Sequence, residues 1–254
     1  MLTLNLSHKI ALVTGATGQL GRVIARTLAD CGADVAIHYN SNEAQAQELV
    51  AEFRGLGVRS LAVQANVGQR DSVFAMRDAV AAELGHPDII VNNAVQQYKW
   101  TTVLEQAEAD YESQFRTCVL QNVFMAQAFV PAMQAQRWGR VIAINTECAA
   151  QCGPTTSAYI AGKRGMDGVL RVLAKEIGEF GITVNQVAPG WTVSEQYREA
   201  GTERAPTYEA ALPLKRRSED FDIANAVAFL ASDLGADITG AFLPVCSGAV
   251  MLGI

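Results

Sequence analysis

The sequence has no run of eighteen or more apolar residues and no stretch dense in lysine or arginine. The first absence argues against a membrane span, and the second argues against binding to the phosphate backbone of a nucleic acid. The chain is also acidic, with a net charge of −6 from 20 basic and 26 acidic residues. Residues 1–9 lack the basic segment followed by an apolar segment that marks a secretory signal peptide, so none is expected.

Cysteine and histidine are scarce, and their spacing predicts neither a disulfide framework nor a metal site. The five cysteines are odd in number and include no CxxC pair, so a reduced, cytoplasmic setting is expected. The three histidines show no HxH or HxxxH spacing, and therefore no zinc site and no other metal are expected. Isolated histidines usually lie at the surface or in loops, and we expect His8, His38 and His86 to do so.

Half of the 254 residues are apolar, and short apolar runs alternate with longer segments of helical period. The runs are continuously apolar, which is typical of strands covered on both faces. Such alternation favours a parallel, doubly wound sheet with right-handed crossovers, and no linker divides residues 1–254, so we predict one α/β domain. The expected strands are Ile10–Val13, Asp34–Ile37, Ser60–Gln64, Asp88–Val91, Arg140–Ile144, Thr183–Val187 and Phe242–Val245. The expected helices are Gly18–Asp30, Glu43–Arg54, Asp71–Leu84, Gln106–Gln136, Ser157–Phe180 and Asp222–Ala231.

One segment, residues 191–218, breaks this alternation. It is polar, it contains arginines, glutamates and two prolines, and it interrupts the return from a strand to a helix. Long insertions after the carboxyl end of a strand commonly cover active sites. We therefore expect residues 191–218 to form a lid over a substrate.

A glycine-rich segment, residues 14–21, follows the first expected strand and opens the first expected helix. Glycines at such a junction allow a tight turn and let backbone N–H groups approach a pyrophosphate at the positive end of the helix. Similar turns also serve simply to connect a strand to a helix. The position of this one on the first strand of an alternating chain favours nucleotide binding.

The end of the second expected strand bears on which dinucleotide is bound. Sites for NAD commonly place an aspartate or glutamate there to hold the ribose hydroxyls, whereas residues 38–42 contain no carboxylate. Asn40, Ser41 and Asn42 can donate hydrogen bonds to a 2′-phosphate, although no arginine is placed to clamp it. We therefore favour NADP(H) over NAD(H).

Tyr159 and Lys163 are four residues apart in an expected helix and therefore share one of its faces. A charged Lys163 close to Tyr159 favours the tyrosinate, so we expect the pKa of Tyr159 to be lowered toward neutral pH. Such a tyrosine can exchange a proton with a carbonyl or an alcohol while a nicotinamide exchanges hydride. The same spacing also arises by chance, so its weight comes from the glycine-rich segment upstream.

With these segments in view, the sequence resembles the short-chain dehydrogenase/reductase family over essentially its whole length. The resemblance implies a Rossmann-type sheet of about seven strands with helices on both faces, a nicotinamide cofactor, a small-molecule substrate, and a homotetramer or homodimer. Five motifs in family order carry it, namely Thr14–Gly21, Asn92-Asn93-Ala94, Tyr159–Lys163, Asn185–Gly190 and Ile238-Thr239-Gly240.

The resemblance also implies roles for individual residues. Tyr159 would donate or accept the proton, Lys163 would bind the nicotinamide ribose and tune Tyr159, and Thr146 would replace the serine that steadies the substrate oxygen. The residues expected along the cofactor are Gly15, Thr17, Gln19, Leu20, Asn40, Ser41, Asn66, Val67, Asn93, Tyr159, Lys163, Pro189, Gly190 and Thr192.

The chain departs from the family pattern at four places. The middle glycine of the turn stands one residue early, at Gly18, and the NNAG motif ends in Val95, a β-branched residue that resists positive φ. The C-terminal VDGG segment reads Val245-Cys246-Ser247-Gly248, so the subunit interface that it commonly forms is expected to differ. Cys118 occupies the place of the helix asparagine of the proton relay, and Asn122, one helical turn later, is the candidate to replace it.

Polar side chains are expected around the substrate, for which Gln96, Glu147 and Trp191 are the candidate residues. Glu147 directly follows Thr146, where a carboxylate can bind hydroxyls or an amine or act as a second acid or base. A solvated loop glutamate is equally compatible with the sequence. We expect the substrate to be a small or medium polar carbonyl or alcohol, or a 3-oxoacyl thioester.

Three activities remain open from the sequence alone. The first is an NAD(P)-dependent oxidoreductase that transfers hydride between the cofactor and a carbonyl or secondary alcohol, with Tyr159 as the general acid or base. The second is an isomerase, epimerase or dehydratase that retains its cofactor and uses Glu147 as an extra base. The third is a catalytically weak nucleotide-binding subunit, suggested by Cys118 and Val95 and disfavoured by the intact Tyr159–Lys163 pair.

Overall fold

The strands of the sheet are built from the continuously apolar runs of the sequence. Aliphatic and β-branched side chains pack well on a pleated surface, and runs that are apolar at every position bury both faces. In the computed structural model, which describes residues 4–251, seven such runs form one parallel sheet. The strands are β1 (Ile10–Val13), β2 (Asp34–Tyr39), β3 (Ser60–Gln64), β4 (Ile89–Asn92), β5 (Gly139–Ile144), β6 (Ile182–Pro189) and β7 (Phe242–Val245).

The strands are ordered β3-β2-β1-β4-β5-β6-β7 across the sheet. The chain therefore winds outward from β1 in one direction and then, from β4 onward, in the other. Such a reversal opens a crevice at the carboxyl ends of β1 and β4, which is where ligands bind in sheets of this type. This doubly wound parallel sheet confirms the fold class predicted from the sequence.

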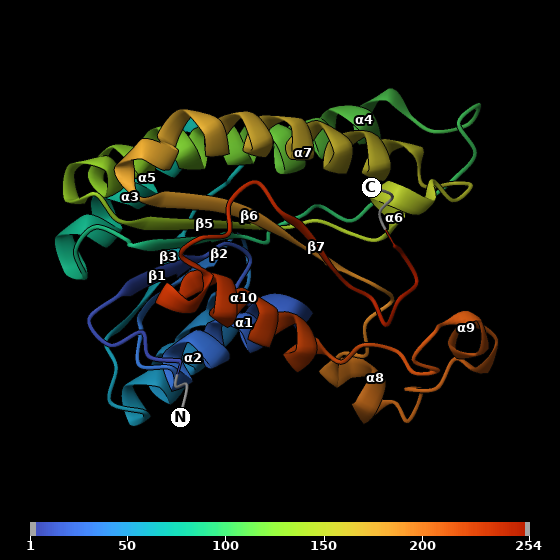
Figure 1. The fold of residues 1–254 in the computed structure, drawn as a ribbon, viewed down its shortest axis with the longest axis horizontal. Coiled ribbons are helices and arrows are strands. Elements are labelled where there is room, and N and C mark those ends of the chain that lie inside the picture. The colour runs from blue at the N-terminus through green and yellow to red at the C-terminus, as the bar shows by residue number, and fades with distance from the viewer. Residues whose placement is uncertain (1–3, 252–254) are drawn as a thin grey trace.

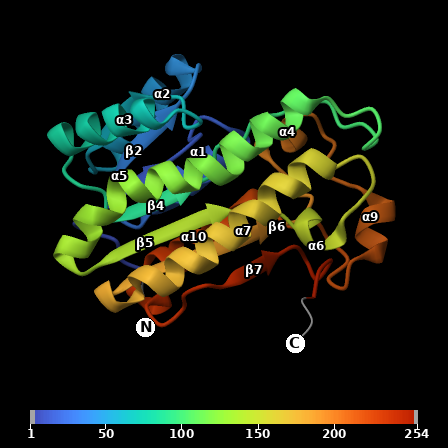
Figure 2. The ribbon, with the colours of Figure 1, turned by 90° about the horizontal axis from the view of Figure 1, so that it is seen from above.

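Helices cover both faces of the sheet (Figure 1). One face carries α1, α2 and α10, and the other carries α3, α5 and α7, of which Figure 2 shows α5 and α7 from above. The α-helices are α1 (Gln19–Asp30), α2 (Glu43–Gly55), α3 (Arg70–Glu83), α4 (Glu108–Gln114), α5 (Gln121–Gln136), α6 (Cys148–Gln151), α7 (Ser157–Ile177), α8 (Glu195–Glu199), α9 (Pro206–Ala211) and α10 (Asp220–Ala231). A π-helical turn, η1 (Phe115–Leu120), and two 3₁₀ turns, η2 (Gly178–Phe180) and η3 (Asp233–Gly235), complete the elements.

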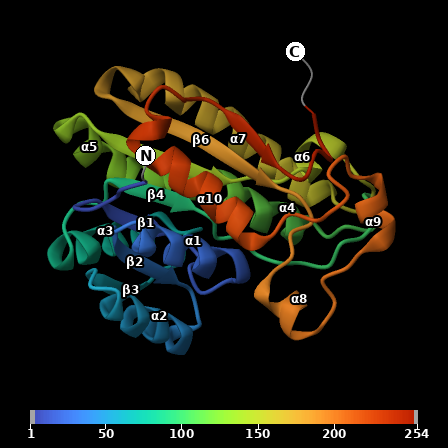
Figure 3. The same cartoon turned by 60° about the horizontal axis from the view of Figure 1, so that its bottom comes forward.

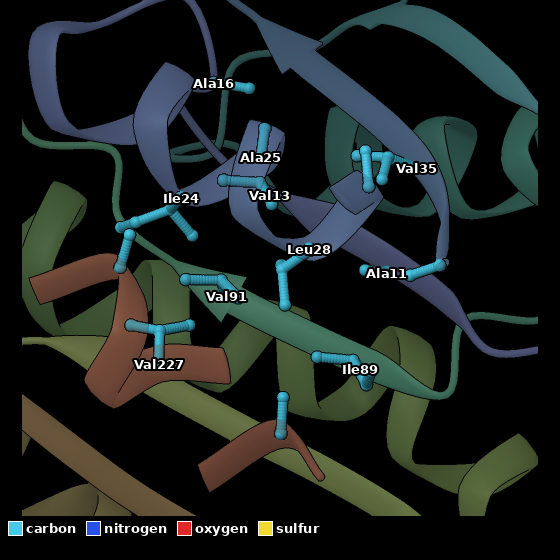
Figure 4. Packing of buried hydrophobic residues seen from close by; sticks show 14 of the residues in the cluster. Ala11, Val13, Ala16, Ile24, Ala25, Leu28, Val35, Ile89, Val91 and Val227 are labelled. Atoms are coloured by element: carbon cyan, nitrogen blue, oxygen red, sulfur yellow. The ribbon is translucent and has the colours of Figure 1, made fainter. Parts of the chain in front are cut away.

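Apolar side chains fill the spaces between the sheet and its helices. Figure 4 shows one of these clusters, in which Val13 and Val91 of the sheet pack with Ile24 and Leu28 of α1 and with Val227 of α10. Full burial of one such side chain stabilises the fold by roughly 1.5–3 kcal/mol. This packing holds α1 firmly against the sheet, and it thereby sets where the first turn of α1 lies.

The continuous helix predicted over residues 106–136 is a wrong prediction. α4 ends at Gln114 and α5 begins at Gln121, and the intervening residues form the π-helical turn η1. Within it, the Thr117 hydroxyl donates a hydrogen bond of 2.7 Å to the Ser113 carbonyl oxygen of the preceding turn. Hydrophobic periodicity does not separate α-helical from π-helical backbone, so the sequence pattern missed the interruption.

Residues 191–218 follow β6 and contain two short helices, α8 and α9. Both lie beyond the carboxyl ends of the strands, near the site described below, as Figures 1 and 3 show. No residue of α8 is buried. Helix α8 is therefore held by polar and aromatic contacts, whereas Val193 and Leu212 elsewhere in the segment are buried.

Candidate active site

Two hollows open at the carboxyl edge of the sheet. A groove of about 900 Å³ runs past the ends of β1, β2, β4, β5 and β6, and a cavity of about 490 Å³ lies at one end of it. Both volumes fall in the range of small-molecule and cofactor sites. The residues that line both hollows are Gln96, Gln97, Thr146, Tyr159, Gly190 and Thr192.

The glycine-rich turn forms one wall of the groove. Gly15 has a φ of +63°, a conformation that side chains disfavour, and a Cβ atom on Gly21 would collide with the Gly15 carbonyl oxygen. The N-cap of α1 is Gly18, and no side chain accepts from the first backbone N–H groups of this helix. These groups and the positive end of the α1 dipole therefore remain available to an anion in the groove.

His38 lies in the groove wall, so the expectation that it sits at the surface or in a loop is wrong. It is a buried residue of β2, and its Nδ1 accepts a hydrogen bond of 2.9 Å from the Gly15 backbone N–H. Its Nε2 must then carry the ring proton, which it donates to the Ala65 carbonyl oxygen at 3.0 Å. Burial lowers the pKa of His38 to about 4, so the neutral ring ties the glycine turn to the end of β3.

Thr14 and Asn93 join the turn to the end of β4. The Thr14 hydroxyl accepts from the Asn93 and Ala94 backbone N–H groups at 2.9 and 3.0 Å, and it donates to Gln121 Oε1 at 2.8 Å. The Asn93 side chain donates to the Thr14 and Gly15 carbonyl oxygens at 2.9 and 3.2 Å. Val95 follows without adopting a positive φ. The motif that ends in valine therefore keeps its connection to the turn.

The structure brings the sequence-predicted cofactor residues together along this one groove. They come from the loop between β1 and α1, from the first turn of α1, from the ends of β2, β3, β4 and β6, and from α7. The groove residues are Gly15, Thr17, Gln19, Leu20, Asn40, Ser41, Asn66, Val67, Asn93, Tyr159, Lys163, Pro189, Gly190 and Thr192. Their roles are taken up below as a proposal.

Tyr159 and Lys163 lie on α7 beneath the point where the groove and the cavity join. The buried Lys163 ammonium lies 5.6 Å from the centre of the Tyr159 ring and donates a hydrogen bond of 2.6 Å to the Ile144 carbonyl oxygen. Trp100 stacks on the Tyr159 ring with a centroid distance of 5.9 Å, and the Tyr98 hydroxyl accepts from the Tyr159 backbone N–H at 2.7 Å. Trp100 thus packs on the ring of Tyr159, and Tyr98 fixes its backbone.

The expected lowering of the Tyr159 pKa is contradicted in the cofactor-free chain. Burial raises the pKa of the Tyr159 phenol well above its ordinary value, and only the Thr146 hydroxyl acts in the lowering direction. Burial also lowers the pKa of the Lys163 ammonium. The Lys163 ammonium donates to the Ile144 carbonyl oxygen, and burial is the largest cause of the raised pKa of the phenol.

Thr146 follows β5 and faces the same junction. Its backbone N–H donates to Asn145 Oδ1 at 2.9 Å, and the Asn145 amide in turn donates to Gln186 Oε1 at 2.6 Å. The Thr146 hydroxyl oxygen accepts from the Cys148 backbone N–H at 3.2 Å, which leaves the hydroxyl proton free to be donated. Thr146 and Tyr159 therefore offer two O–H groups at the wall of one cavity.

Glu147 is a buried residue that also lines the cavity, with 4% of its surface exposed. Its Oε1 accepts a hydrogen bond of 2.7 Å from the Tyr208 hydroxyl of α9, whereas its Oε2 is buried without a partner. Burial raises the pKa of the Glu147 carboxyl, and the hydrogen bond from Tyr208 acts in the opposite direction. Nothing in the position of Tyr208 in the sequence indicates its contact with Glu147, so Tyr208 is not among the residues predicted for the site. The other two candidate substrate residues, Gln96 and Trp191, line the same cavity.

Asn122 does not reach this site, so the hypothesis that it replaces the relay asparagine lacks geometric support. Its side-chain amide donates to the Cys118 carbonyl oxygen at 2.6 Å, and its Oδ1 accepts from Asn92 Nδ2 at 2.7 Å. Asn122 is buried and lines neither the groove nor the cavity. The π-helical turn changes the rotation between residues 118 and 122, so the spacing rule of an α-helix does not apply there.

No group of three or more histidine, cysteine, aspartate or glutamate side chains in residues 4–251 is arranged to hold a metal ion. In the same residues, no helix combines the length and the apolar character that crossing a membrane requires.

Comparison with known proteins adds independent evidence. A family model described as Enoyl-(Acyl carrier protein) reductase matches residues 15–250. The 3-oxoacyl-(acyl-carrier-protein) reductase FabG of Staphylococcus epidermidis is 38% identical over 245 residues, which cover 96% of this chain and 100% of the relative. The FabG of Escherichia coli (strain K12) is 35% identical over 260 residues, covering 98% and 100%.

Solved structures give the same picture. A blue fluorescent protein from a metagenomic library, in complex with NADPH, has a TM-score of 0.88 at 34% identity, covering 97% of this chain and 100% of that one. A 7α-hydroxysteroid dehydrogenase complexed with NADH and 7-oxo glycochenodeoxycholic acid has a TM-score of 0.88 at 28% identity, covering 98% and 97%. The chain therefore belongs to the short-chain dehydrogenase/reductase family, and it is an NAD(P)-dependent oxidoreductase that transfers hydride between a nicotinamide cofactor and a carbonyl or secondary alcohol.

Proposed function

We propose that this enzyme reduces a carbonyl compound with Tyr159 as the general acid, and oxidises the corresponding alcohol in the reverse direction. The observation that carries the proposal is the meeting of the groove and the cavity at Tyr159 and Thr146, with Lys163 behind them. A carbonyl group in the cavity then lies within reach of two O–H donors and of a ligand in the groove.

The residues of the groove suit a nicotinamide dinucleotide. The uncapped first turn of α1 offers backbone N–H groups to the diphosphate, and a side chain at Gly15 or Gly21 would displace the turn because its Cβ would press on neighbouring protein atoms. Asn93 and Lys163 would hold the ribose next to the nicotinamide, and Pro189 and Gly190 would border the ring. When bound, the nicotinamide supplies or accepts the hydride.

Residues of the chain itself hold and transfer the proton. Thr146 donates a hydrogen bond to the substrate oxygen and holds it beside the Tyr159 hydroxyl. As negative charge develops on that oxygen, Tyr159 passes its proton to it and becomes a tyrosinate. The Lys163 ammonium, held by the Ile144 carbonyl oxygen, stabilises the tyrosinate. Burial raises the pKa of the phenol, so the tyrosine stays protonated and ready to donate until the substrate oxygen is charged.

NADP(H) is the proposed form of the cofactor. No carboxylate lines the groove beyond β2, where Asn40, Ser41 and Asn42 stand instead. Asn42 uses its Oδ1 to cap α2 through the Gln45 backbone N–H, so its amide nitrogen remains free to donate to a 2′-phosphate. We expect a lower dissociation constant for NADPH than for NADH in a fluorescence titration. Tighter binding of NADH would overturn this preference.

The proposed substrate is a carbonyl compound with polar groups, of small to medium size, or a 3-oxoacyl thioester like that of the reductases to which the chain is similar. Glutamine side chains, Thr146 and Glu147 offer polar partners in the cavity, while Trp100 and Trp191 offer flat apolar walls. We propose residues 191–218 as the lid of this cavity, because Trp191 and Thr192 line it and Tyr208 bonds Glu147.

We further propose that the enzyme is a cytoplasmic homotetramer or homodimer. The five cysteines are free, which suits a reducing compartment. Phe115 of η1 and Val172 of α7 expose about half of their apolar surface on one face of the molecule, as expected of a subunit contact. Light scattering coupled to size-exclusion chromatography measures the subunit number, and a monomer at micromolar concentration would contradict the proposal.

The test of the mechanism follows NADPH absorbance over a panel of carbonyl substrates. Tyr159→Phe removes only the acidic hydroxyl, so we expect turnover to fall by about 10³-fold while NADPH still binds. Tyr111→Phe is the matched control, because that hydroxyl bonds Ser157 and lines neither hollow. Equal turnover in the unaltered enzyme and in Tyr159→Phe would remove Tyr159 from the proposed mechanism.

A further inference from the structure

Helix α8 is attached to the cofactor half of the molecule by charge rather than by apolar packing. Glu195 Oε2 lies 2.7 Å from Arg22 Nε, and Glu195 Oε1 lies 2.8 Å from Arg26 Nη1. Both arginines belong to α1, whereas Glu195 is the first residue of α8. Figure 3 shows α8 on the side of the sheet that α1 and α10 cover.

Gln19 adds a direct link between the glycine turn and the same helix. Its Oε1 accepts from the Gln196 backbone N–H at 3.3 Å and from Arg22 Nη2 at 2.9 Å. Gln19 is the first residue of α1 and lines the groove. The family pattern has a glycine at this place, which has no side chain to accept from Gln196. The unusual residue of the turn thus has a structural partner in residues 191–218.

The other polar contacts of α8 join it to a different part of the chain. Arg198 pairs with Glu219 at 2.9 Å and with Asp220 at 2.7 Å, and both acids stand where residues 191–218 rejoin α10. These contacts therefore join α8 to the end of its own segment and not to α1. The contacts of Gln19, Arg22 and Arg26 are the ones that tie α8 to the helix whose N-terminus faces the groove.

We propose that Gln19, Arg22 and Glu195 form an anchor that holds α8 beside the glycine-turn end of the groove, and that this anchor opens before the dinucleotide leaves. This inference rests on the proposed function, because it takes the groove as the cofactor site. Glu195 is a positioning residue, since it acts through α8 and lines neither hollow, whereas Gln19 both bonds α8 and lines the groove.

The strength of the anchor suits a contact that opens in each catalytic cycle. The Arg22 side chain is 13% exposed and that of Glu195 is 30% exposed, so solvent screens their attraction in part. Partly exposed ion pairs are weak individually. The anchor therefore slows the opening of residues 191–218 without preventing it.

Removing the Glu195 charge distinguishes the anchor from a purely electrostatic effect of Glu195 on the bound cofactor. If Glu195 acted only through its charge, Glu195→Gln would remove a negative charge near the bound diphosphate, and the cofactor would bind more tightly and leave more slowly. If Glu195 anchors α8, the same variant frees the helix and the cofactor leaves faster. The two explanations predict opposite signs.

The experiment measures NADPH release from the full-length enzyme by stopped-flow fluorescence, with an excess of unlabelled NADP⁺ as the trap. We expect Glu195→Gln to release NADPH about fivefold faster, which is the scale of one exposed ion pair. Glu199→Gln is the matched control, because it changes the same residue type in the same helix and Glu199 has no ion-pair partner among the described residues. Glu195→Asp keeps the charge and is expected to restore part of the slow release.

A second readout reports on α8 without any cofactor. Hydrogen exchange of the Gln196 amide should be faster in Gln19→Gly than in the unaltered enzyme, because this N–H loses its acceptor. NADPH release from Glu195→Gln that is unchanged or slower than from the unaltered enzyme would overturn the anchor. Failure of the unaltered enzyme to bind NADPH would instead overturn the proposed function, and the anchor with it.

Discussion

The glycine turn and residues 191–218 border the same groove but are built in contrasting ways. The turn, residues 14–21, rests on a layer of aliphatic side chains from β1, β4, α1 and α10. Residues 191–218 rest on charged, aromatic and hydrogen-bonded contacts, and α8 buries no side chain at all. Apolar packing is dense and tolerates little change, whereas partly exposed polar contacts form and break readily.

This contrast indicates that the two regions have different roles in the enzyme. The turn must present its backbone N–H groups in one geometry, so it is built into the core. A segment that admits and releases ligands must open at low cost, so it draws on contacts near the weak end of the range of local stabilities. The two regions should therefore respond to changes as separate units.

A methyl group added to each region should have unequal consequences. In Gly21→Ala, the new Cβ collides with the Gly15 carbonyl oxygen, and the backbone around it is packed, so we expect a loss of about 3 kcal/mol in the free energy of unfolding. In Gly201→Ala, the new Cβ has open space around it, and only the φ of +64° costs about 1 kcal/mol. Urea denaturation measures both, and equal losses would contradict the contrast.

Acidification should weaken the turn through His38. The pKa of this buried ring is lowered from 6.5 to about 4 in the folded chain, so the unfolded chain binds more protons between those values. Stability is therefore complete above about pH 6.5 and is lost as the pH falls toward 4, by about 3 kcal/mol in total. We expect the His38→Asn variant to lack this loss between pH 6.5 and 4. The exposed-histidine variant His86→Gln serves as the control and should retain it.

The sequence predicted the parts of this molecule that repeat a simple physical pattern. Continuous apolar runs located the seven strands, and the glycine spacing and the Tyr159–Lys163 spacing located the two ends of the groove. These signals are local, because burial, turn geometry and helical spacing act between near neighbours. The fold and the outline of the site could therefore be predicted before any coordinates were known.

The remainder depends on which segments meet in three dimensions. His38 was expected at the surface because its own neighbours carry no sign that the Gly15 amide needs an acceptor. Asn122 was expected at the site because α-helical spacing was assumed across a π-helical turn. The pKa of Tyr159 was expected to fall because Lys163 is only four residues away. The sequence does not show that the Lys163 ammonium bonds the Ile144 carbonyl oxygen, nineteen positions away in the chain.

Arg217 is a buried arginine without an acidic ion-pair partner in the described part of the chain. Its guanidinium donates to the carbonyl oxygens of Trp191, Thr192 and Glu203 and lies 4.4 Å from the centre of the Trp191 ring. Arg217→Lys loses the planar set of donors, so residues 191–218 should open more easily by about 2 kcal/mol. Proteolysis within this segment should be roughly 30-fold faster, while the urea midpoint of the whole chain changes little. A matching fall in the midpoint would show that the segment unfolds only with the core.

The smallest expected effect has the opposite pH sign to that of His38 and comes from Glu147. Burial raises the pKa of this carboxyl, so the folded chain holds its proton more firmly than the unfolded chain does. The contribution of Glu147 to stability is therefore present at low pH and is lost as the pH rises through the raised pKa. Because the carboxyl accepts from Tyr208 of α9, the loss should appear as faster opening of residues 191–218 at pH 8 than at pH 5. Hydrogen exchange, corrected for its intrinsic pH dependence, measures this opening. Glu147→Gln cannot ionise and should show the same opening at both values, whereas a pH dependence that survives in this variant would assign the effect to another group.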